Sequence, residues 1–493
     1  MAQPNSAIEN IVRLMTEGGD ARLHLDPRTG LNRYFSAPRP SKAIAYASST
    51  ANDISEAAFA HVAQVAGEIG TELAPADYTV RLEAIRGRIR RAYGVAPEVA
   101  IVLSASGTDL EYVALACVAG LAPQGVHNIL LGADEVGSGC IHSAHGYYFA
   151  DETPLGVAVS PGLPVPGLGG PMVDLVDLKV RDERDRPRPS GEIAALMAEA
   201  VRDARAAGRH ALVHIVHGSK TGLILPSLAD ADVMSAEHGE AISLVVDACQ
   251  ARIAAPAVAD YLERDAMVFV TGSKFMGGPP FSGFALVPAR FRREAQPLPA
   301  GLATIFRRAE WPLGWPGADG LPESANPGLL LRLEASLYEL ERFLSLPSDA
   351  IERVILAFHA AVRFEIIEKS PAHRVAPYPP GEKIEADTHP IEMRTLSTLD
   401  LTELCPEARP GGATFEDAQG WHKAMAEAGV RLGQPVKCVH LGDGRWGATL
   451  RIGLSMPIVS DHAALDDAAL AAAFERDMAA VREALTAACA TTV

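Results

Sequence analysis

The sequence predicts an α/β protein with a mostly parallel central sheet, helices on both faces of that sheet, and a smaller C-terminal α+β domain. From Val99 onward, short segments rich in β-branched residues alternate with helical segments. This alternation is typical of a parallel sheet covered by helices. After about Arg290 the sequence changes to amphipathic helices, which indicates a second domain.

Residues 1–95 are expected to form an N-terminal arm and cap. A short helical pattern is followed by a loop rich in Pro and Gly, and further helical segments extend to Arg91. The polar segment 45–55 follows this loop. It is compatible with two roles, because it could fold over an active site and contact substrate or form the N-cap region of a helix.

Residues 96–290 are expected to form the large α/β domain. The predicted strands are 100–104, 128–131, 211–216, 243–247, 266–271 and 283–287. The predicted helices are 109–119, 191–207 and 228–237. Residues 160–189 are rich in Pro and Gly and carry charged residues, which predicts an inserted surface loop.

Residues 291–493 are expected to form the small α+β domain. Amphipathic helices are predicted over 328–344 and 350–368, followed by a strand-like segment and a final Ala-rich helix over about 461–488. No internal repeat is visible in the sequence.

The composition restricts the class of protein. The 493 residues are 48% hydrophobic and 21% charged, which is ordinary usage for a folded protein of two or three domains. A net charge of -17, with no long basic run, argues against a nucleic-acid partner. An anionic substrate would therefore have to be held by a local site.

The cysteines and the apolar segments predict a soluble cytoplasmic protein. Six cysteines are scattered without a Cys-x-x-Cys pair, so reduced thiols are expected and no metal site is predicted. The first residues lack a basic region followed by an apolar one, and no apolar stretch reaches the length of a membrane span. Secretion and membrane insertion are not expected.

Lys274 is the residue that indicates a chemistry. It follows the apolar segment 266–270 and lies in the Gly- and Pro-rich loop 271–280. Burial disfavours the charged form of an amine, so a lysine sheltered in such a loop can lose its proton and form an imine with an aldehyde cofactor. Pyridoxal phosphate is such a cofactor. It would require an anion site, a partner for its pyridine nitrogen and a clamp for the substrate carboxylate.

The segment Ser104 to Asp109 is the candidate anion site. It lies between a predicted strand and a predicted helix, and it contains Ser106, Gly107 and Thr108. The free N–H groups at a helix start, together with hydroxyls and small residues, can bind a phosphate. The same turn would also suit an ordinary helix N-cap.

Asp247 is the candidate partner for a pyridine nitrogen. It ends a predicted buried strand 27 positions before Lys274, and ligands bind at such strand ends in open α/β sheets. A carboxylate there can keep the pyridine nitrogen protonated, although Asp247 could also serve as a helix N-cap. Gln250 could donate a hydrogen bond to the phenolic oxygen of the cofactor or lie on a helix surface.

Four segments together resemble the pyridoxal-phosphate enzymes of fold type I, and most closely the group of class V aminotransferases and cysteine desulfurases. The resemblance covers roughly residues 95 to 460. In chain order, the segments are Ser106-Gly107-Thr108, His217-Gly218-Ser219-Lys220-Thr221-Gly222 with Pro226, Asp247-Ala248-Cys249-Gln250, and Thr271-Gly272-Ser273-Lys274.

The resemblance implies roles for these residues. Lys274 would be the Schiff-base lysine and proton shuttle, and Asp247 would pair with the pyridine nitrogen. Gly107 and Thr108 would hold the phosphate. Hydroxyl contacts would come from Thr271 or Ser273. The resemblance also implies a homodimer with active sites at the subunit interface.

Arg451 is the candidate carboxylate clamp. It lies in the otherwise apolar segment 447–455, and its planar guanidinium suits two-point contact with a carboxylate. The class V group is similar in having an arginine in such a late strand. A structural salt bridge is the alternative for a buried arginine.

Two departures from the resemblance argue against a cysteine desulfurase. In that group a histidine after a glutamate stacks on the cofactor ring, whereas Val136 follows Glu135 here. His142 and His145 lie further on, and each could reach the ring or be an ordinary loop or core histidine.

The cysteines are the second departure. Cys405 precedes a proline in an acidic stretch, and Cys438 lies in apolar sequence. Neither setting favours a thiolate, so persulfide chemistry is not expected.

The sequence therefore predicts a pyridoxal-phosphate enzyme that acts on a small amino acid. Transamination, with a keto acid as cosubstrate, requires only the groups already named. The alternative is a lyase or a specialised enzyme that makes or breaks C–C or C–S bonds. A non-catalytic protein with this fold would not need Lys274.

Overall fold

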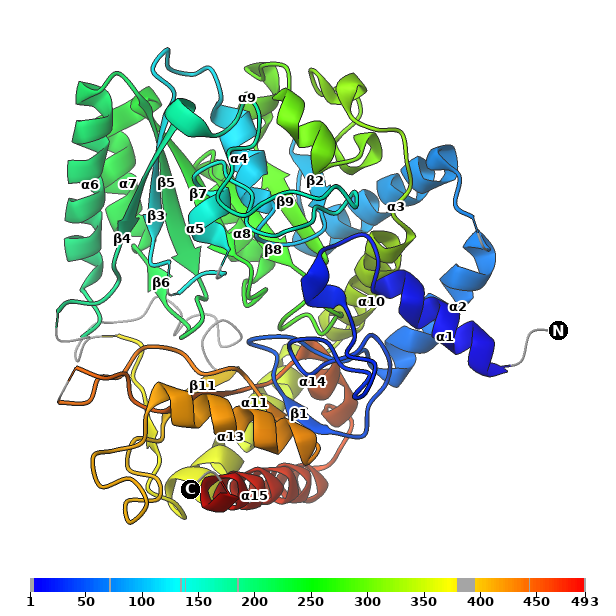
Figure 1. Cartoon of the computed structure of the whole chain (residues 1–493), viewed down its shortest axis with the longest axis vertical. Helices are drawn as coiled ribbons and strands as arrows, with labels where there is room; N and C mark the ends of the chain where they lie inside the picture. The colour runs from blue at the N-terminus through cyan, green and yellow to red at the C-terminus, as the bar shows by residue number, and fades with distance from the viewer. Residues whose placement is uncertain are drawn as a thin grey trace.

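An eight-stranded sheet forms the centre of the larger part of the protein (Figure 1). The computed structural model describes residues 4–70, 72–133, 135–137, 139–183, 186–378, 395–442 and 444–491. The strand order is β2-β9-β8-β7-β5-β3-β4, and β6 pairs with β5. The bounds are β2 Ala100–Ser104, β3 Val126–Leu131, β4 Val173–Leu178, β5 His210–His217, β6 Ile224–Leu225, β7 Ile242–Ala248, β8 Met267–Thr271 and β9 Gly283–Val287.

The sheet is mostly parallel, as the sequence predicts. β4, β3, β5, β7 and β8 run parallel, whereas β9 is antiparallel to both β8 and β2. Every residue of β2, β5, β7, β8 and β9 is buried. This explains why these strands are almost continuously apolar in sequence, since both faces are covered.

Helices cover both faces of the sheet. Successive side chains of a strand point to opposite faces, so Val245 packs in one apolar cluster with α4 and Val246 packs in another with α6 and α8. The helices of this part are α4 Leu110–Val118, α5 Cys140–Ser143, α6 Ser190–Ala206, α7 Leu228–His238, α8 Ala255–Glu263 and α9 Ala289–Arg293.

Three N-terminal helices pack beside the sheet. They are α1 Pro4–Met15, α2 Glu56–Ile69 and α3 Pro75–Tyr93, and all three contact α10 Pro327–Leu344. The hydroxyl of Ser55 accepts the amide N–H of Ala58 and so caps the start of α2. Ser55 thus takes one of the two roles that the sequence leaves open for segment 45–55, that of a helix N-cap. One further short helix, η1 Ala21–Leu23, lies between α1 and α2 in sequence.

The C-terminal elements form a layer below the sheet in the view of Figure 1. An antiparallel sheet joins β10 His373–Arg374, β11 Leu396–Asp400 and β13 Thr449–Gly453. β12 Val430–Leu432 pairs in parallel with the N-terminal β1 Ile44–Tyr46. The helices are α11 Ser348–Ala361 with its π-helical extension η7 Val362–Ile367, α13 Phe415–Glu427, α14 Met456–His462 and α15 Asp467–Thr491.

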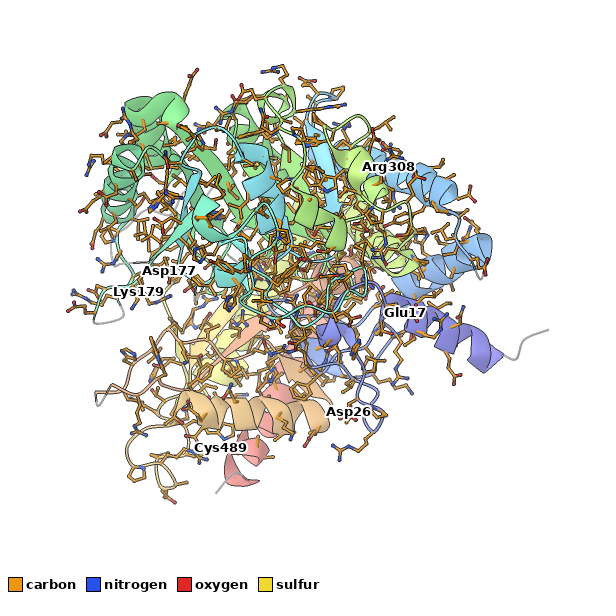
Figure 2. All side chains as sticks on the ribbon, turned by 45° about the horizontal axis from the view of Figure 1, so that its top comes forward. Glu17, Asp26, Asp177, Lys179, Arg308 and Cys489 are labelled. Carbon is orange, nitrogen blue, oxygen red and sulfur yellow. A yellow bond between two sulfur atoms is a disulfide. The ribbon has the colours of Figure 1, made fainter. Side chains whose placement is uncertain are left out.

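The prediction of a surface loop over 160–189 is wrong in part, because this stretch contains β4. The strand pairs with β3 at the edge of the sheet, and Asp174 and Asp177 are exposed on it. Figure 2 shows Asp177 and Lys179 at the outer margin of the molecule. An edge strand needs fewer apolar residues than a central strand. The sequence of β4 is therefore as polar as that of a surface loop.

The prediction of six reduced thiols is also wrong, because Cys405 and Cys489 form a disulfide. They are 84 residues apart in sequence. Cys489 is labelled in Figure 2, in the part of the molecule opposite the large sheet. The other four cysteines are free thiols. Among the described residues, no helix combines the length and apolar character needed to cross a membrane.

Candidate active site

A cavity of about 340 Å³ lies at the ends of the parallel strands, between the large sheet and the C-terminal elements. Eight of the nine residues singled out by sequence line it. They are Ser106, Gly107, Thr108, Asp247, Thr271, Ser273, Lys274 and Arg451. The fold thus brings together residues from β2, β7, β8 and β13, as expected for a site at the C-terminal edge of an open α/β sheet.

The turn between β2 and α4 forms an anion cradle. The amide N–H groups of Gly107 and Thr108 donate to no group among the described residues. A Cβ atom on Gly107 would lie 2.8 Å from Thr271 Cγ2 and 2.9 Å from Cys249 Sγ, so only glycine fits. The turn therefore presents unsatisfied donors at a helix N-terminus, the geometry that binds phosphate.

Asp109 gives this cradle a titratable group. Ser106 Oγ donates to Asp109 Oδ2 at 2.6 Å, and the amide of Asp109 donates back to Ser106 Oγ at 3.2 Å. Burial raises the pKa of Asp109 to about 7, although the hydrogen bond from Ser106 acts to lower it. The carboxyl of Asp109 is thus close to half ionised at neutral pH.

Asp247 stands at the end of β7 with its carboxylate at the cavity wall. Its Oδ1 accepts the amide N–H of Cys249 at 2.9 Å. No helix begins there, because α8 starts only at Ala255. Asp247 therefore does not cap a helix.

Two buried groups lie near Asp247. Glu111 Oε2 and His214 Nε2 are 3.6 Å apart. Burial raises the pKa of Glu111, and the charge of Asp247 raises it further. Burial lowers the pKa of His214 to about 3. His214 is therefore neutral at pH 7, and burial favours the protonated form of Glu111.

The loop that carries Lys274 is held rigidly. Gly272 and Gly278 pack against Ser336 of α10, where a Cβ atom would lie 2.2 Å and 1.9 Å from Ser336 Oγ. The side-chain amide of Asn52 donates to the main-chain oxygen of Lys274 at 2.6 Å. Thr271 donates its hydroxyl to the main-chain oxygen of Cys249 at 2.8 Å. These contacts fix the base of the Lys274 side chain at the cavity wall.

Arg451 is buried without a carboxylate partner among the described residues. Its Nε donates to Gln434 O at 2.9 Å, Nη1 to Ser49 O at 3.2 Å, and Nη2 to Thr50 Oγ1 at 3.1 Å. Burial lowers the pKa of Arg451 to about 10. The guanidinium thus stays charged at neutral pH while its partners are neutral oxygens, so the alternative of a structural salt bridge does not hold.

Gln250 is the one predicted site residue that does not line the cavity. Its side-chain amide donates to Ser49 O at 3.3 Å, and its Oε1 accepts from Arg252 Nη1 at 2.7 Å. Arg252 also binds Ser48 and Thr395. Gln250 therefore belongs to the contact that joins residues 48–49 to the sheet.

The three residues considered for ring stacking do not line the cavity either. Val136 is buried in the core, His142 is exposed, and the ring of His145 packs edge-on against Tyr147. Gly137 and Cys140 occupy this part of the wall instead. Burial raises the pKa of the Cys140 thiol, so Cys140 is a neutral group there.

Ser49 and Thr50 line the cavity, and they belong to the polar segment 45–55, for which contact with an active site was one of the two expected roles. Sequence reasoning assigned no role to four other residues of the cavity wall, which are Arg22, Tyr34, Lys220 and Lys437. Lys220 lies in one of the motif segments, so a signal existed for it. Arg22 had none, because it lies in the N-terminal arm, far from every motif.

The cavity is cationic although the chain is acidic. Among the described residues that line it, five are basic and one is acidic. The basic residues are Arg22, Lys220, Lys274, Lys437 and Arg451, and the acidic one is Asp247. Burial and the charge of Arg451 lower the pKa of Lys220 to about 8. The site is thus built for anionic ligands.

The cysteines do not supply a reactive thiolate. Cys405 is in the disulfide, and burial raises the pKa of Cys438 to about 12. A thiol with that pKa is protonated at neutral pH and is a poor nucleophile.

Comparisons with known proteins identify the fold. No protein-family model matches the sequence, and no curated protein sequence matches it. The structure is similar to the cysteine desulfurase CsdA of Escherichia coli, with a TM-score of 0.54 and 14% identity over 90% of this chain and 94% of that chain.

Two aminotransferases are similar as well. The ureidoglycine–glyoxylate aminotransferase of Bacillus subtilis has a TM-score of 0.54 and 12% identity, over 91% of this chain and 93% of that chain. The pyridoxamine–pyruvate aminotransferase of Mesorhizobium loti has a TM-score of 0.50 and 15% identity, over 92% and 98%. The resemblance in fold expected from the sequence is therefore confirmed, and the chain has the fold of the pyridoxal-phosphate-dependent enzymes of fold type I.

Proposed function

We propose that the protein is a pyridoxal-phosphate-dependent enzyme that acts on a small amino acid, with Lys274 as the residue that carries the cofactor. The observation that carries this proposal is the convergence of Lys274, Asp247, the Gly107–Thr108 cradle and Arg451 on one cavity. The residues fit the cofactor, because the cradle offers two open N–H groups and no room for a Cβ atom at Gly107.

Each group of the cavity has a chemical task. When bound, the cofactor withdraws electrons from the α-carbon of an amino acid. The Asp247 carboxylate would hold a proton on the pyridine nitrogen. Arg451 would bind the α-carboxylate through a charge-assisted hydrogen bond and so orient the α-carbon. The Lys274 amine would then take the α-proton and return it to a neighbouring atom.

Transamination is the reaction we propose first, with a keto acid as second substrate. It needs a carboxylate site, a mobile proton at Lys274 Nζ and a protonated pyridine nitrogen, and the cavity offers residues for all three. A cysteine desulfurase is disfavoured, because Cys438 is a buried thiol and Cys405 is in a disulfide.

A lyase or another enzyme that makes or breaks C–C or C–S bonds is the second candidate. Ser49 and Thr50 from the N-terminal segment and Tyr34 from the arm enter the cavity. These additional hydroxyls could move a proton to or from a substrate side chain, which transamination does not require.

The wider assignments remain proposals. We propose a homodimer with shared active sites, a cytoplasmic location, and a division into residues 1–95, 96–290 and 291–493. The disulfide between Cys405 and Cys489 bears on the location, since such bonds are rare in the cytoplasm of most organisms.

Visible absorbance during titration with amino acids tests the proposed function. We expect the protein incubated with pyridoxal phosphate to show a visible band that Lys274→Ala loses. If one amino acid abolishes the band and a keto acid restores it, the reaction is transamination. A new long-wavelength band that persists would indicate the second candidate. A cofactor band that no amino acid changes would indicate a non-catalytic protein, and the absence of any band would refute the cofactor assignment.

A further inference from the structure

We propose that Arg22 binds the phosphate group of the cofactor, so that the N-terminal arm completes the cofactor site. This inference rests on the proposed function for the identity of the ligand. It adds a charged residue to a cradle that the motif segments supply only with N–H and O–H donors.

The arm reaches the cradle through a short helix. Arg22 lies in η1 and lines the same cavity as Ser106, Gly107 and Thr108. The next residue, Leu23, forms a separate apolar cluster with Ala105 and Phe281. Since Ala105 directly precedes Ser106, this cluster fixes η1 against the base of the cradle.

The guanidinium of Arg22 is held in one orientation. Its Nε donates to both carboxylate oxygens of Asp20 at 2.9 and 3.1 Å, and Nη2 donates to Asp20 Oδ2 at 2.7 Å. The rings of Phe149 and Phe281 lie 5.0 and 4.7 Å from its Cζ atom. An arginine that is fixed in this way loses little side-chain entropy on binding a ligand.

One edge of this guanidinium is available to a ligand. Nη1 donates to no group among the described residues. Asp20 neutralises the opposite edge, so the Nη1 edge presents two N–H donors at the cavity. This is half of the planar fork with which arginine binds phosphate oxygens.

The negative charge of a phosphate bound at the cradle would be stabilised by a nearby cation. A phosphate monoester carries a charge of about -1.5 to -2 at neutral pH. Burial acts to lower the pKa of Arg22, but Asp20, Tyr34 and Asp109 together hold it above its ordinary value. Asp109 directly precedes α4 and lies within electrostatic range of Arg22, and its own carboxyl disfavours an anion. The N–H groups of the cradle contribute only partial charges. Arg22, although it is paired with Asp20, adds a charge-assisted donor at Nη1.

The other basic residues of the cavity are held elsewhere. Arg451 binds Gln434, Ser49 and Thr50, and the ammonium of Lys437 lies 5.2 Å from the ring centre of Phe415. These elements belong to the C-terminal part and to segment 45–55. Lys274 is the residue proposed to carry the cofactor, and Lys220 lies in the loop after β5 next to Arg451. Arg22 is therefore the arginine that the N-terminal arm adds to the cavity.

A comparison of pyridoxal phosphate with pyridoxal, which lacks the phosphate, tests this inference. We expect Arg22→Met to weaken binding of pyridoxal phosphate roughly tenfold to a hundredfold, the worth of one charge-assisted contact. Binding of pyridoxal should stay unchanged. Arg28→Met is the matched control, because Arg28 lies in the same arm with 88% of its side chain exposed. The change in absorbance on binding gives each affinity.

Three outcomes would overturn the inference. Equal losses for both ligands would show that Arg22 only supports the fold, and unchanged affinities would show that it does not touch the phosphate. Arg22→Lys keeps the charge and is expected to recover part of the lost affinity, so an Arg22→Lys protein that behaves like Arg22→Met would also count against it.

The two proposals can fail separately. If the native protein binds neither pyridoxal phosphate nor pyridoxal, the proposed function fails. The anion site can still be measured with inorganic phosphate as the probe. Phosphate should then raise the thermal midpoint of the native protein and of Arg28→Met but not that of Arg22→Met, and equal stabilisation of all three would refute a phosphate contact at Arg22.

Discussion

Arg451 donates a hydrogen bond from Nη1 to the main-chain oxygen of Lys220 at 3.3 Å. Arg451 lies in β13 of the C-terminal part, and Lys220 lies in the loop after β5 of the large sheet. The bond thus joins the two parts of the protein at the cavity. It also places two basic residues side by side, and the charge of Arg451 lowers the pKa of Lys220.

Binding of a carboxylate should depend on pH through Lys220. The pKa of Lys220 is lowered to about 8 by burial and by Arg451. Lys220 is therefore charged below that pH and becomes neutral as the pH rises through it. We expect the affinity for pyruvate, a carboxylate without an amine, to fall roughly tenfold over this transition.

Calorimetric titration of the protein with pyruvate, on both sides of pH 8, measures this effect. Lys220→Met should bind weakly at neutral pH and show no transition near pH 8. Lys179→Met is the control, since Lys179 lies at the exposed edge of the sheet (Figure 2). A transition that survives in Lys220→Met would assign it to another group.

Affinity for pyridoxal phosphate should depend on pH through Asp109. Burial raises the pKa of this carboxyl to about 7. It is mostly neutral below that pH and gains a negative charge above it, next to the cradle. Because the charge would repel a phosphate, we expect affinity to fall as the pH rises through about 7.

Asp109→Asn removes the titrating group but keeps an oxygen for Ser106. The difference between native and variant affinities, followed by absorbance, isolates the contribution of Asp109 from the ionisation of the phosphate itself. Parallel pH profiles for the two proteins would contradict the prediction.

Gly107→Ala should damage both the cradle and the fold. Its Cβ atom would lie 2.8 Å from Thr271 and 2.9 Å from Cys249. Overpacking of this kind costs about 1–3 kcal/mol, so we expect a lower midpoint in urea and weaker cofactor binding. Gly67→Ala is the control, because a Cβ atom at Gly67 in α2 meets no atom within 4 Å. Unchanged stability of Gly107→Ala would show that the turn can shift.

Thiol titration should distinguish the disulfide from six reduced cysteines. Four cysteines are free and two are joined in the structure. We expect four reactive thiols in protein unfolded without a reductant and six after reduction. The disulfide closes a long loop, so Cys405→Ser should lower the free energy of unfolding by about 2–5 kcal/mol. Six thiols without a reductant would instead restore the original prediction.

Much of the fold was predictable because its strands are buried on both faces. Segments such as 244–246 and 266–270 are continuously apolar, and their order along the chain suffices to predict a parallel sheet. β4 was not predicted, because it lies at the edge of the sheet and its apolar residues are interrupted by the exposed Asp174 and Asp177. The limits of the domains and the roles of the site residues remain predictions.

The pattern of residues along the chain is enough to predict the α/β fold and the local motifs that place Asp247 and Lys274 at the ends of adjacent strands. These features depend on residues that are close together in the chain, so the hydrophobic periodicity and the turn residues of the sequence are enough to predict them. The packing of the folded chain brings Arg22 and Lys220 into the same cavity, turns Gln250 toward Ser49 and Arg252, and joins Cys405 to Cys489. Contacts between residues that are distant in the chain depend on how the elements pack, and no local pattern in the sequence specifies that packing.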